Sequence, residues 1–197
     1  ILKKGSVDNA PKEHVRVRFT DKSKGAKRFV KEGGVETLEI GVGKPEEMNV
    51  RKFRILCRAV VQAAKVNHIK KIALQFDATP KFFAHLKNVS PEELSQLIAE
   101  NLEMANFEFT HFKTEPKEGF DAVEEVCVYG KSSAGVERAV KKGREIGRAV
   151  NACRVLANTP GGDMTPTVLA KAARDAAKGL PIKVTTLGVK EMKKLGM

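Results

Sequence analysis

The four histidines are the first residues to consider for chemistry, because imidazole can ligate a metal or act as a general base. They stand at His14, His68, His85 and His111. No two are four residues apart, and there is no His-Glu-x-x-His motif to place two ligands on one helix face. We therefore interpret them as surface histidines that are solvated or hydrogen-bonded, and assign no metal to them.

The cysteines and serines offer no recognisable nucleophile. Cys57, Cys127 and Cys153 are odd in number, widely spaced and flanked by apolar residues. Without a Cys-x-x-Cys pair a thiolate zinc site is not indicated, and we predict three reduced, buried thiols in a cytosolic protein. No serine lies in a Gly-x-Ser-x-Gly setting. The acidic residues show no paired-carboxylate arrangement.

One glycine-rich turn invites a phosphate-binding interpretation. Gly41-Val42-Gly43-Lys44 follows a predicted strand and precedes a predicted helix. It lacks the Gly-x-x-x-x-Gly-Lys-Ser/Thr spacing of a P-loop and the third glycine of a dinucleotide fingerprint. We interpret it as a tight strand-to-helix turn. The residue pattern thus assigns no catalytic, cofactor-binding or metal-ligating residue.

The net charge of +12 is unevenly distributed. Residues 91–130 hold two basic and ten acidic side chains, a local net charge of −8, so the remainder carries +20. This remainder is either a solvated basic surface or a nucleic-acid-binding surface. RNA-binding modules usually add exposed aromatic residues for stacking, whereas this sequence has one Tyr and no Trp.

No membrane partner is predicted. Hydrophobic residues make up 42% of the chain, enough for a sizeable core. No apolar run approaches the ~20 residues that span a bilayer. The first residues lack the apolar segment of a secretory signal, so we predict a cytoplasmic protein. The chain starts without Met and ends abruptly at Met197, and we expect it to be cut at both ends.

Hydrophobic periodicity predicts alternating strands and helices, and therefore the α/β class. Strands are predicted at Val15–Phe19, Val35–Val42, Ile69–Phe76, Phe107–Phe112, Ala122–Tyr129 and Ile182–Leu187. Helices are predicted at Val50–Val66, from Ser90, at Ser132–Asn158, from Thr165 to Gly179 and at Val189–Leu195. We expect the first five strands to form one mixed sheet with helices on both faces, covered by the helices that begin near Val50 and Ser132. Asp21–Lys31 is interpreted as a surface connection.

The predicted helix at 132–158 is long, at ~27 residues or about 40 Å. Its apolar stripe includes Gly143 and Gly147. A glycine inside a helix costs about 1 kcal/mol relative to alanine, so we expect another element to pack close to the backbone there. Lys141, Arg144 and Arg148 fall on the opposite side. The helix is therefore expected to connect two domains.

The segment after residue 150 resembles a known family. Asn151–Ala177, NACRVLANTPGGDMTPTVLAKAARDAA, is similar to the start of the catalytic domain in the leucyl aminopeptidase family, peptidase family M17. The matching residues are Arg154, Leu156, Asn158, Pro160, Thr165, Pro166, Leu169 and Ala170. Gly162 departs from the family, which more often has Asn there. Leu38–Lys65 and Lys190–Met197 resemble two further family segments in the right order.

The resemblance implies a fold and an activity. It implies an N-terminal domain similar to macro domains over residues 1–131, a linking helix over 132–158, and the beginning of the catalytic domain over 159–197. Family members remove N-terminal residues, often Leu, from peptides. They use two divalent metal ions, commonly zinc or manganese, to hold and activate water, and they assemble as hexamers.

The family's metal-ligand motifs are absent from this sequence. Neither Asn-Thr-Asp-Ala-Glu-Gly-Arg nor Val-Gly-Lys-Gly occurs, and both are expected beyond Met197. We therefore assign no catalytic or metal residue, and expect this portion to serve assembly and access to the site, with peptide substrates bound elsewhere. Two alternatives stay open: a DNA-binding module that uses the basic surface, as in some bacterial members, and a macro-like ADP-ribose binder.

Overall fold

The computed structural model describes residues 2–4, 11, 13–21, 25, 27–32, 34–75, 86, 88–129 and 133–197. The chain divides into two compact units, Ile1–Asn151 and Ala152–Met197. The division falls inside one helix. The finer predicted division at residues 131 and 158 stays a prediction.

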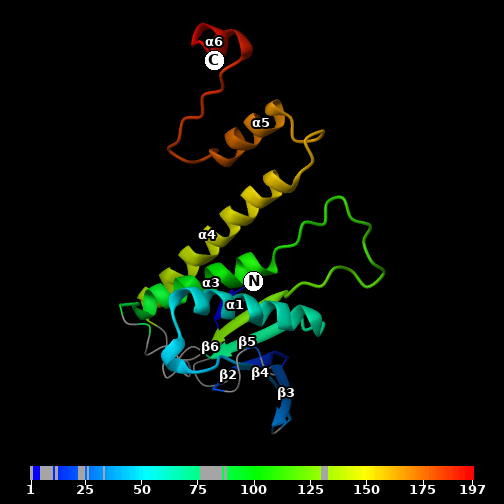
Figure 1. Cartoon of the computed structure of the whole chain (residues 1–197), viewed down its shortest axis with the longest axis vertical. Coiled ribbons are helices and arrows are strands. Elements are labelled where there is room, and N and C mark those ends of the chain that lie inside the picture. The colour runs from blue at the N-terminus through cyan, green and yellow to red at the C-terminus, as the bar shows by residue number, and fades with distance from the viewer. Residues whose placement is uncertain are drawn as a thin grey trace. The chain divides into compact units, whose positions relative to one another are not determined.

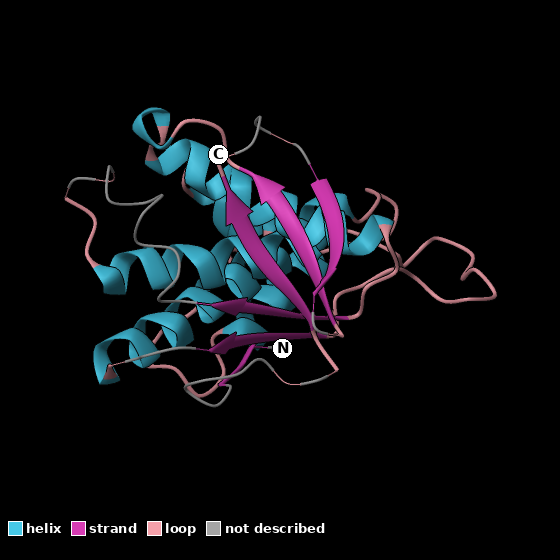
Figure 2. Ribbon diagram, turned by 90° about the horizontal axis from the view of Figure 1, so that it is seen from below, coloured by secondary structure: helices cyan, strands magenta, loops and turns pink. Residues whose placement is uncertain are grey.

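The first unit is built on a mixed β-sheet (Figure 2). The described strands are β1 (Leu2–Lys4), β2 (Val15–Thr20), β3 (Lys27–Glu32), β4 (Val35–Gly41), β5 (Lys71–Gln75) and β6 (Glu125–Tyr129). They lie in the order β1-β6-β5-β2-β4-β3. Every neighbouring pair is parallel except β3 and β4. The predicted α/β class and mixed sheet are therefore confirmed.

The described helices agree with the predicted ones (Figure 1). They are α1 (Val50–Val66), α3 (Pro91–Asn106), α4 (Ala134–Asn158), α5 (Pro166–Ala176) and α6 (Val189–Lys194), with a short 3-10 helix η1 (Pro45–Glu47) before α1. None of these helices combines the length and apolar character that a membrane crossing requires.

Three helices are capped at their N-termini by side-chain hydrogen bonds. The Asn49 side chain accepts from the backbone N–H of Lys52 at 2.9 Å, and Thr165 caps α5 in the same way. Ser90 and Glu93 form a reciprocal capping box, in which the Ser90 donors hold the pKa of the Glu93 carboxyl below its usual value. Ser132, where the long helix was predicted to begin, lies outside the described residues.

The main core lies between the sheet and the helices α1 and α3. Alternate strand residues such as Val17, Leu38 and Ile72 face the helices and are 5% exposed or less. On α1, Phe53 and Val60 belong to the same buried cluster. Every second side chain of a strand and every third or fourth side chain of a helix points to the same side, so these residues meet in one layer.

The other sheet face carries a smaller buried cluster and buried polar groups. Ala73, Cys127 and Tyr129 form the cluster. Nearby on this face Arg18 Nη2 donates to Glu39 Oε1 at 2.6 Å, and the Glu39 side chain is 8% exposed. The described helices that pack on the sheet, α1 and α3, share the first face.

Helix α4 packs on α3, which corrects the prediction that it covers the sheet. A Cβ atom built on Gly143 would lie 3.0 Å from the Cβ of Ala99, and one on Gly147 would lie 2.7 Å from the Cβ of Glu103. The Asn151 amide donates to the Glu103 carbonyl at 3.0 Å. The expected close approach at both glycines is confirmed, with a helix as the partner.

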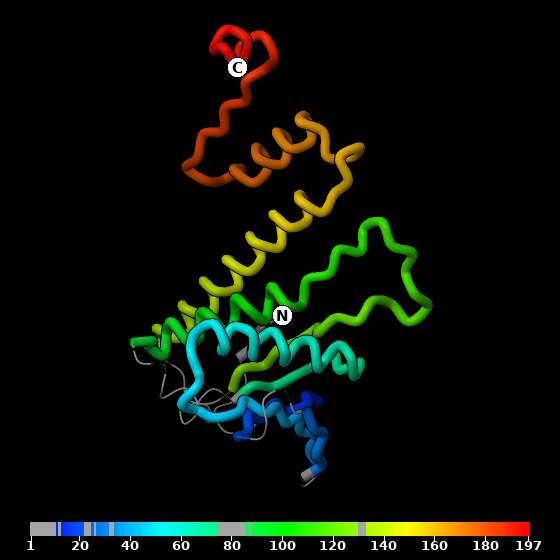
Figure 3. The backbone as a smooth tube through the Cα atoms, viewed as in Figure 1, coloured from blue at the N-terminus to red at the C-terminus, as the bar shows by residue number. Residues whose placement is uncertain are grey.

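In the described part of the chain, two predicted strands are absent, and a predicted surface connection contains a strand. Phe107–Phe112 lies in the irregular segment that leaves α3 and returns to β6 (Figure 3). The expected surface connection Asp21–Lys31 instead contains most of β3, an edge strand paired with β4. Ile182–Leu187 in the second unit is irregular. A run of β-forming residues becomes a strand only where another strand offers a free edge.

The second unit has an open, apolar surface. It contains the end of α4, α5 and α6, and none of the residues from Ala152 to Met197 is buried. Several of its large apolar side chains are strongly exposed: Leu169, Leu180, Ile182, Val189 and Leu195. A unit of this size buries too little surface to form a core of its own.

Candidate functional site

The Gly41–Lys44 turn is the predicted strand-to-helix connection, and it forms one wall of a recess. Strand β4 ends at Gly41, whose carbonyl accepts from Gly25 N–H at 3.0 Å, and Val42 N–H donates to the Thr20 carbonyl at 2.9 Å. Gly43 then has φ +78°, in the left-handed region that favours glycine. This turn directs the chain into η1 and α1.

The recess has a volume of about 150 Å³ and a mostly apolar lining. Ile40 from β4, Met48 before α1 and Leu56 from α1 are buried side chains of the floor. Ile55 also lines the recess but is 49% exposed. The chain thus presents solvent-accessible apolar surface in a concave place, which is the usual character of a small-molecule site.

The charged side chains that line the recess are mostly basic. They are Lys27, Lys44 and Lys52, with Glu47 as the acid among the lining residues. Lys52 Nζ pairs with Glu47 Oε2 at 3.2 Å. Asn49 caps the first turn of α1, which itself carries no acidic residue. The recess therefore favours anionic groups.

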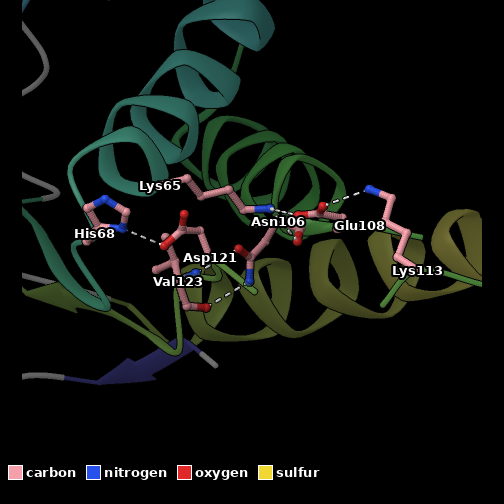
Figure 4. A network of polar contacts seen from close by, with 7 residues as sticks. All are labelled: Lys65, His68, Asn106, Glu108, Lys113, Asp121 and Val123. Carbon is pink, nitrogen blue, oxygen red and sulfur yellow. Dashed lines mark hydrogen bonds and ion pairs between the residues drawn. The ribbon is translucent and has the colours of Figure 1, made fainter. Parts of the chain in front are cut away.

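A second polar cluster joins the C-terminal ends of α1 and α3 to the approach to β6 (Figure 4). Asn106 donates from its amide to the Val123 carbonyl at 2.7 Å and accepts from the Val123 N–H at 2.9 Å. Lys65 Nζ donates to the Asn106 carbonyl at 3.1 Å, and His68 Nδ1 lies 2.8 Å from Asp121 Oδ1. These contacts hold together the two ends of the segment between α3 and β6, here called the base of that segment. We therefore assign this cluster a structural role.

The histidines are not all at the surface, which corrects one prediction. His14 is buried, and its Nε2 lies 3.1 Å from Glu125 Oε1. Its backbone N–H donates to the Pro11 carbonyl, and the chain enters β2 at the next residue. His68 and His111 are exposed, and His111 packs edge-on against Phe112. His85 lies outside the described residues.

The cysteines also divide. Cys57 and Cys127 are buried as predicted, and burial raises the pKa of the Cys57 thiol to about 12. Burial and the Glu125 carboxylate raise the pKa of Cys127. Cys153 is exposed, which corrects the prediction of three buried thiols. It lies on α4 beyond Asn151, the last residue of the first unit, where α3 no longer covers the stripe.

The described residues hold no group of three or more His, Cys, Asp or Glu side chains placed to bind a metal ion. The residues that carry the family resemblance lie at the end of α4, in the turn after it and at the start of α5. Thr165 caps α5 and Pro166 begins it, while Asn158 ends α4. Thr165, Pro166 and Asn158 thus stand at the ends of the two helices that this connection joins.

Sequence reasoning missed the recess. Its signal is present in part, because the Gly-Val-Gly-Lys turn is visible in the sequence but lacks the spacing of a phosphate-binding loop. Lys27 falls in the expected surface connection, and only the pairing of β3 with β4 brings it to the same place as Lys44 and Lys52. Such a juxtaposition depends on strand order, which a hydrophobic pattern does not determine.

Comparison with known proteins gives the family. Residues 18–116 match the model described as the cytosol aminopeptidase family, N-terminal domain. A probable cytosol aminopeptidase of Nostoc punctiforme is 32% identical over 158 residues, which cover 80% of this chain and 30% of that protein. One from Exiguobacterium sibiricum is 31% identical over 166 residues, covering 84% of this chain and 31% of the relative. The chain spans about a third of the length of these curated relatives.

Solved structures agree on the fold. A mutant tomato leucine aminopeptidase superposes with a TM-score of 0.70 at 24% identity, covering 88% of this chain and 34% of that chain. The bottromycin maturation enzyme BotP in complex with Mn gives a TM-score of 0.70 at 19% identity, covering 94% and 40%. Because the family model covers just over half of the residues, the chain belongs to the cytosol aminopeptidase family and contains its N-terminal domain.

Proposed function

We propose that this chain is part of a metal-dependent leucyl aminopeptidase that removes N-terminal amino acids from peptides. The match of residues 18–116 to the family's N-terminal domain carries the proposal. The curated relatives are named as probable cytosol aminopeptidases, which supports the same activity and a cytoplasmic location.

In this proposal the present segment serves assembly and access to the site. Two divalent metal ions, manganese or zinc, would bind outside these 197 residues, since the family's metal-ligand motifs do not occur here. The structurally similar enzyme BotP forms a complex with Mn, which supports manganese as one candidate. The described residues do not fit a metal centre, so no step of the reaction is assigned to them.

We further propose that the full-length protein is a homo-hexamer. The exposed apolar side chains of the second unit, such as Leu169 and Ile182, support a need for cover by further protein. Their cover would come from the rest of the polypeptide or from other subunits.

DNA binding is the second candidate, favoured by the basic surface of α4. Arg138, Lys141, Lys142 and Arg148 are all exposed on this helix. Retention on DNA that falls steeply as salt rises would support this role. The ADP-ribose alternative is not favoured by the recess, whose volume of about 150 Å³ is below the range of sites for larger ligands.

The experiment is a hydrolysis assay of the full-length protein on leucine p-nitroanilide. We expect turnover that a chelator abolishes and that added manganese or zinc restores. A full-length protein that is folded and metal-loaded, yet hydrolyses no aminoacyl anilide or dipeptide, would contradict the proposal.

A further inference from the structure

We propose that the recess between β4 and the start of α1 binds a small carboxylate with a branched aliphatic body. The proposal does not depend on the peptidase activity. The observation behind the proposal is an apolar cavity lined by three lysines, next to the first two turns of α1.

The cavity determines the size and polarity of the ligand body. A protein cavity of about 150 Å³ takes a benzene-sized molecule. The floor is made by branched or flexible apolar side chains, among them Ile40, Met48 and Leu56. Ile55 is 49% exposed although it lines the cavity, so an apolar ligand would remove its surface from water. A body the size of a leucine side chain meets both conditions.

The charges determine the head group. The lining carries three lysines and one glutamate, and that glutamate is already paired with Lys52. Lys27 and Lys44 form no ion pair with a described residue. Lysine side chains that line a cavity of this size attract a small anion, and a single carboxylate needs no more room than the cavity offers.

Other ligand classes fit less well. A divalent cation prefers several oxygen ligands, and Glu47 is the one carboxylate of the lining. A nucleotide needs a larger cavity than about 150 Å³. A fully apolar molecule would make no charge interaction with the lysines. The carboxylate belongs either to a free branched amino acid or to the corresponding organic acid, because the two share the aliphatic body and the carboxylate and differ in the α-ammonium group.

The test is an amide-resolved NMR titration of the full chain with 4-methylpentanoate, its uncharged amide 4-methylpentanamide, and L-leucine. We expect 4-methylpentanoate to shift the signals of residues 41–56 and to bind at least about fivefold more tightly than the amide, a ratio that one charge contact provides. Leucine that binds as tightly as 4-methylpentanoate identifies an amino acid as the source. Weaker binding of leucine identifies an organic acid.

Two variants test the residues. K44Q should weaken 4-methylpentanoate binding about fivefold and reduce its salt dependence, and A59L should abolish binding by filling the cavity. K178Q, in the second unit, is the matched control and should change neither. Equal affinity for acid and amide, unchanged binding by K44Q with a native spectrum, or shifts confined to residues outside the recess would each overturn the proposal.

Discussion

The three cysteines differ in how readily each thiolate can form. The thiolate is the reactive species, and burial raises the pKa of Cys57 to about 12 and that of Cys127 in the same direction. Cys153 is exposed on α4. We expect iodoacetamide at pH 8 to label one thiol in the native protein and three in denaturant, as counted by mass spectrometry.

The matched control is Cys153→Ser, which should remove nearly all native labelling while leaving two reactive thiols in denaturant. Rapid labelling of Cys57 in the native protein would show that α1 opens locally or that its buried face is different.

Gly143 is predicted to be intolerant of any side chain. The Cβ atom of an alanine would meet the Cβ of Ala99 at 3.0 Å and would press closer still on the Gln96 carbonyl. Overpacking of this kind costs about 1–3 kcal/mol, which exceeds the roughly 1 kcal/mol that alanine gains over glycine within a helix. We therefore expect Gly143→Ala to lower the free energy of unfolding, as measured by denaturant titration.

Two controls separate overpacking from the addition of a methyl group by itself and from the loss of charge. Gly161→Ala meets no atom within 4 Å and should be close to neutral. Arg148→Ala removes weak ion pairs from a side chain that is 49% exposed, so its cost should be about 0.5 kcal/mol or less. Equal losses for Gly143→Ala and Arg148→Ala would show that the buried face of α4 has been assigned wrongly.

At the scale of elements, the order of the segment between α3 and β6 depends on the hydrogen bonds at its base. Asn106 makes two hydrogen bonds to the backbone of Val123, and each such bond contributes about 0.5–1.5 kcal/mol. Asn106→Ala should therefore lose about 1–3 kcal/mol of stability. It should also raise hydrogen exchange at residues 107–122, measured by mass spectrometry.

Lys113→Ala is the control within the same segment, because it removes only the exposed ion pair with Glu108. It should leave exchange at the base unchanged. If Asn106→Ala accelerated exchange throughout the first unit to the same degree, the base would be part of the global core and not a local closure.

The helices were largely predictable from sequence, whereas part of the sheet was not. Helix α1 begins and ends where the hydrophobic stripe predicts, because its cap and its buried face are local properties of the sequence. Phe107–Phe112 shows the same alternation as a strand, yet both edges of β6 are already taken by β1 and β5. Lys27–Glu32 is rich in charge because an edge strand keeps charges toward water.

For the whole molecule, we predict that these 197 residues alone have no peptidase activity. Neither metal-ligand motif of the family is in the sequence, and the described residues form no metal-binding cluster. The measurement is leucine p-nitroanilide turnover with added manganese or zinc. Turnover that scales with this chain and survives repurification would refute the prediction.

The second unit should be the least stable part of this chain. None of its residues from Ala152 onward is buried, whereas Val60 and Val61 of α1 are fully buried. Amides of α5 should therefore exchange with solvent much faster than those of α1. Equal protection of α5 and α1 in a dilute, monomeric sample would contradict this expectation.

The position of β1 has a consequence for biosynthesis. Leu2 pairs with Val126, so the first strand finds its partner only after more than a hundred intervening residues have been made. At about 5–20 residues per second, a ribosome needs roughly 6–25 s to reach that point. Strands β2 to β5 and helix α1 are contiguous in sequence and can assemble during this interval. The nascent chain would therefore carry an unpaired first strand until β6 emerges, a period in which chaperones have access to it.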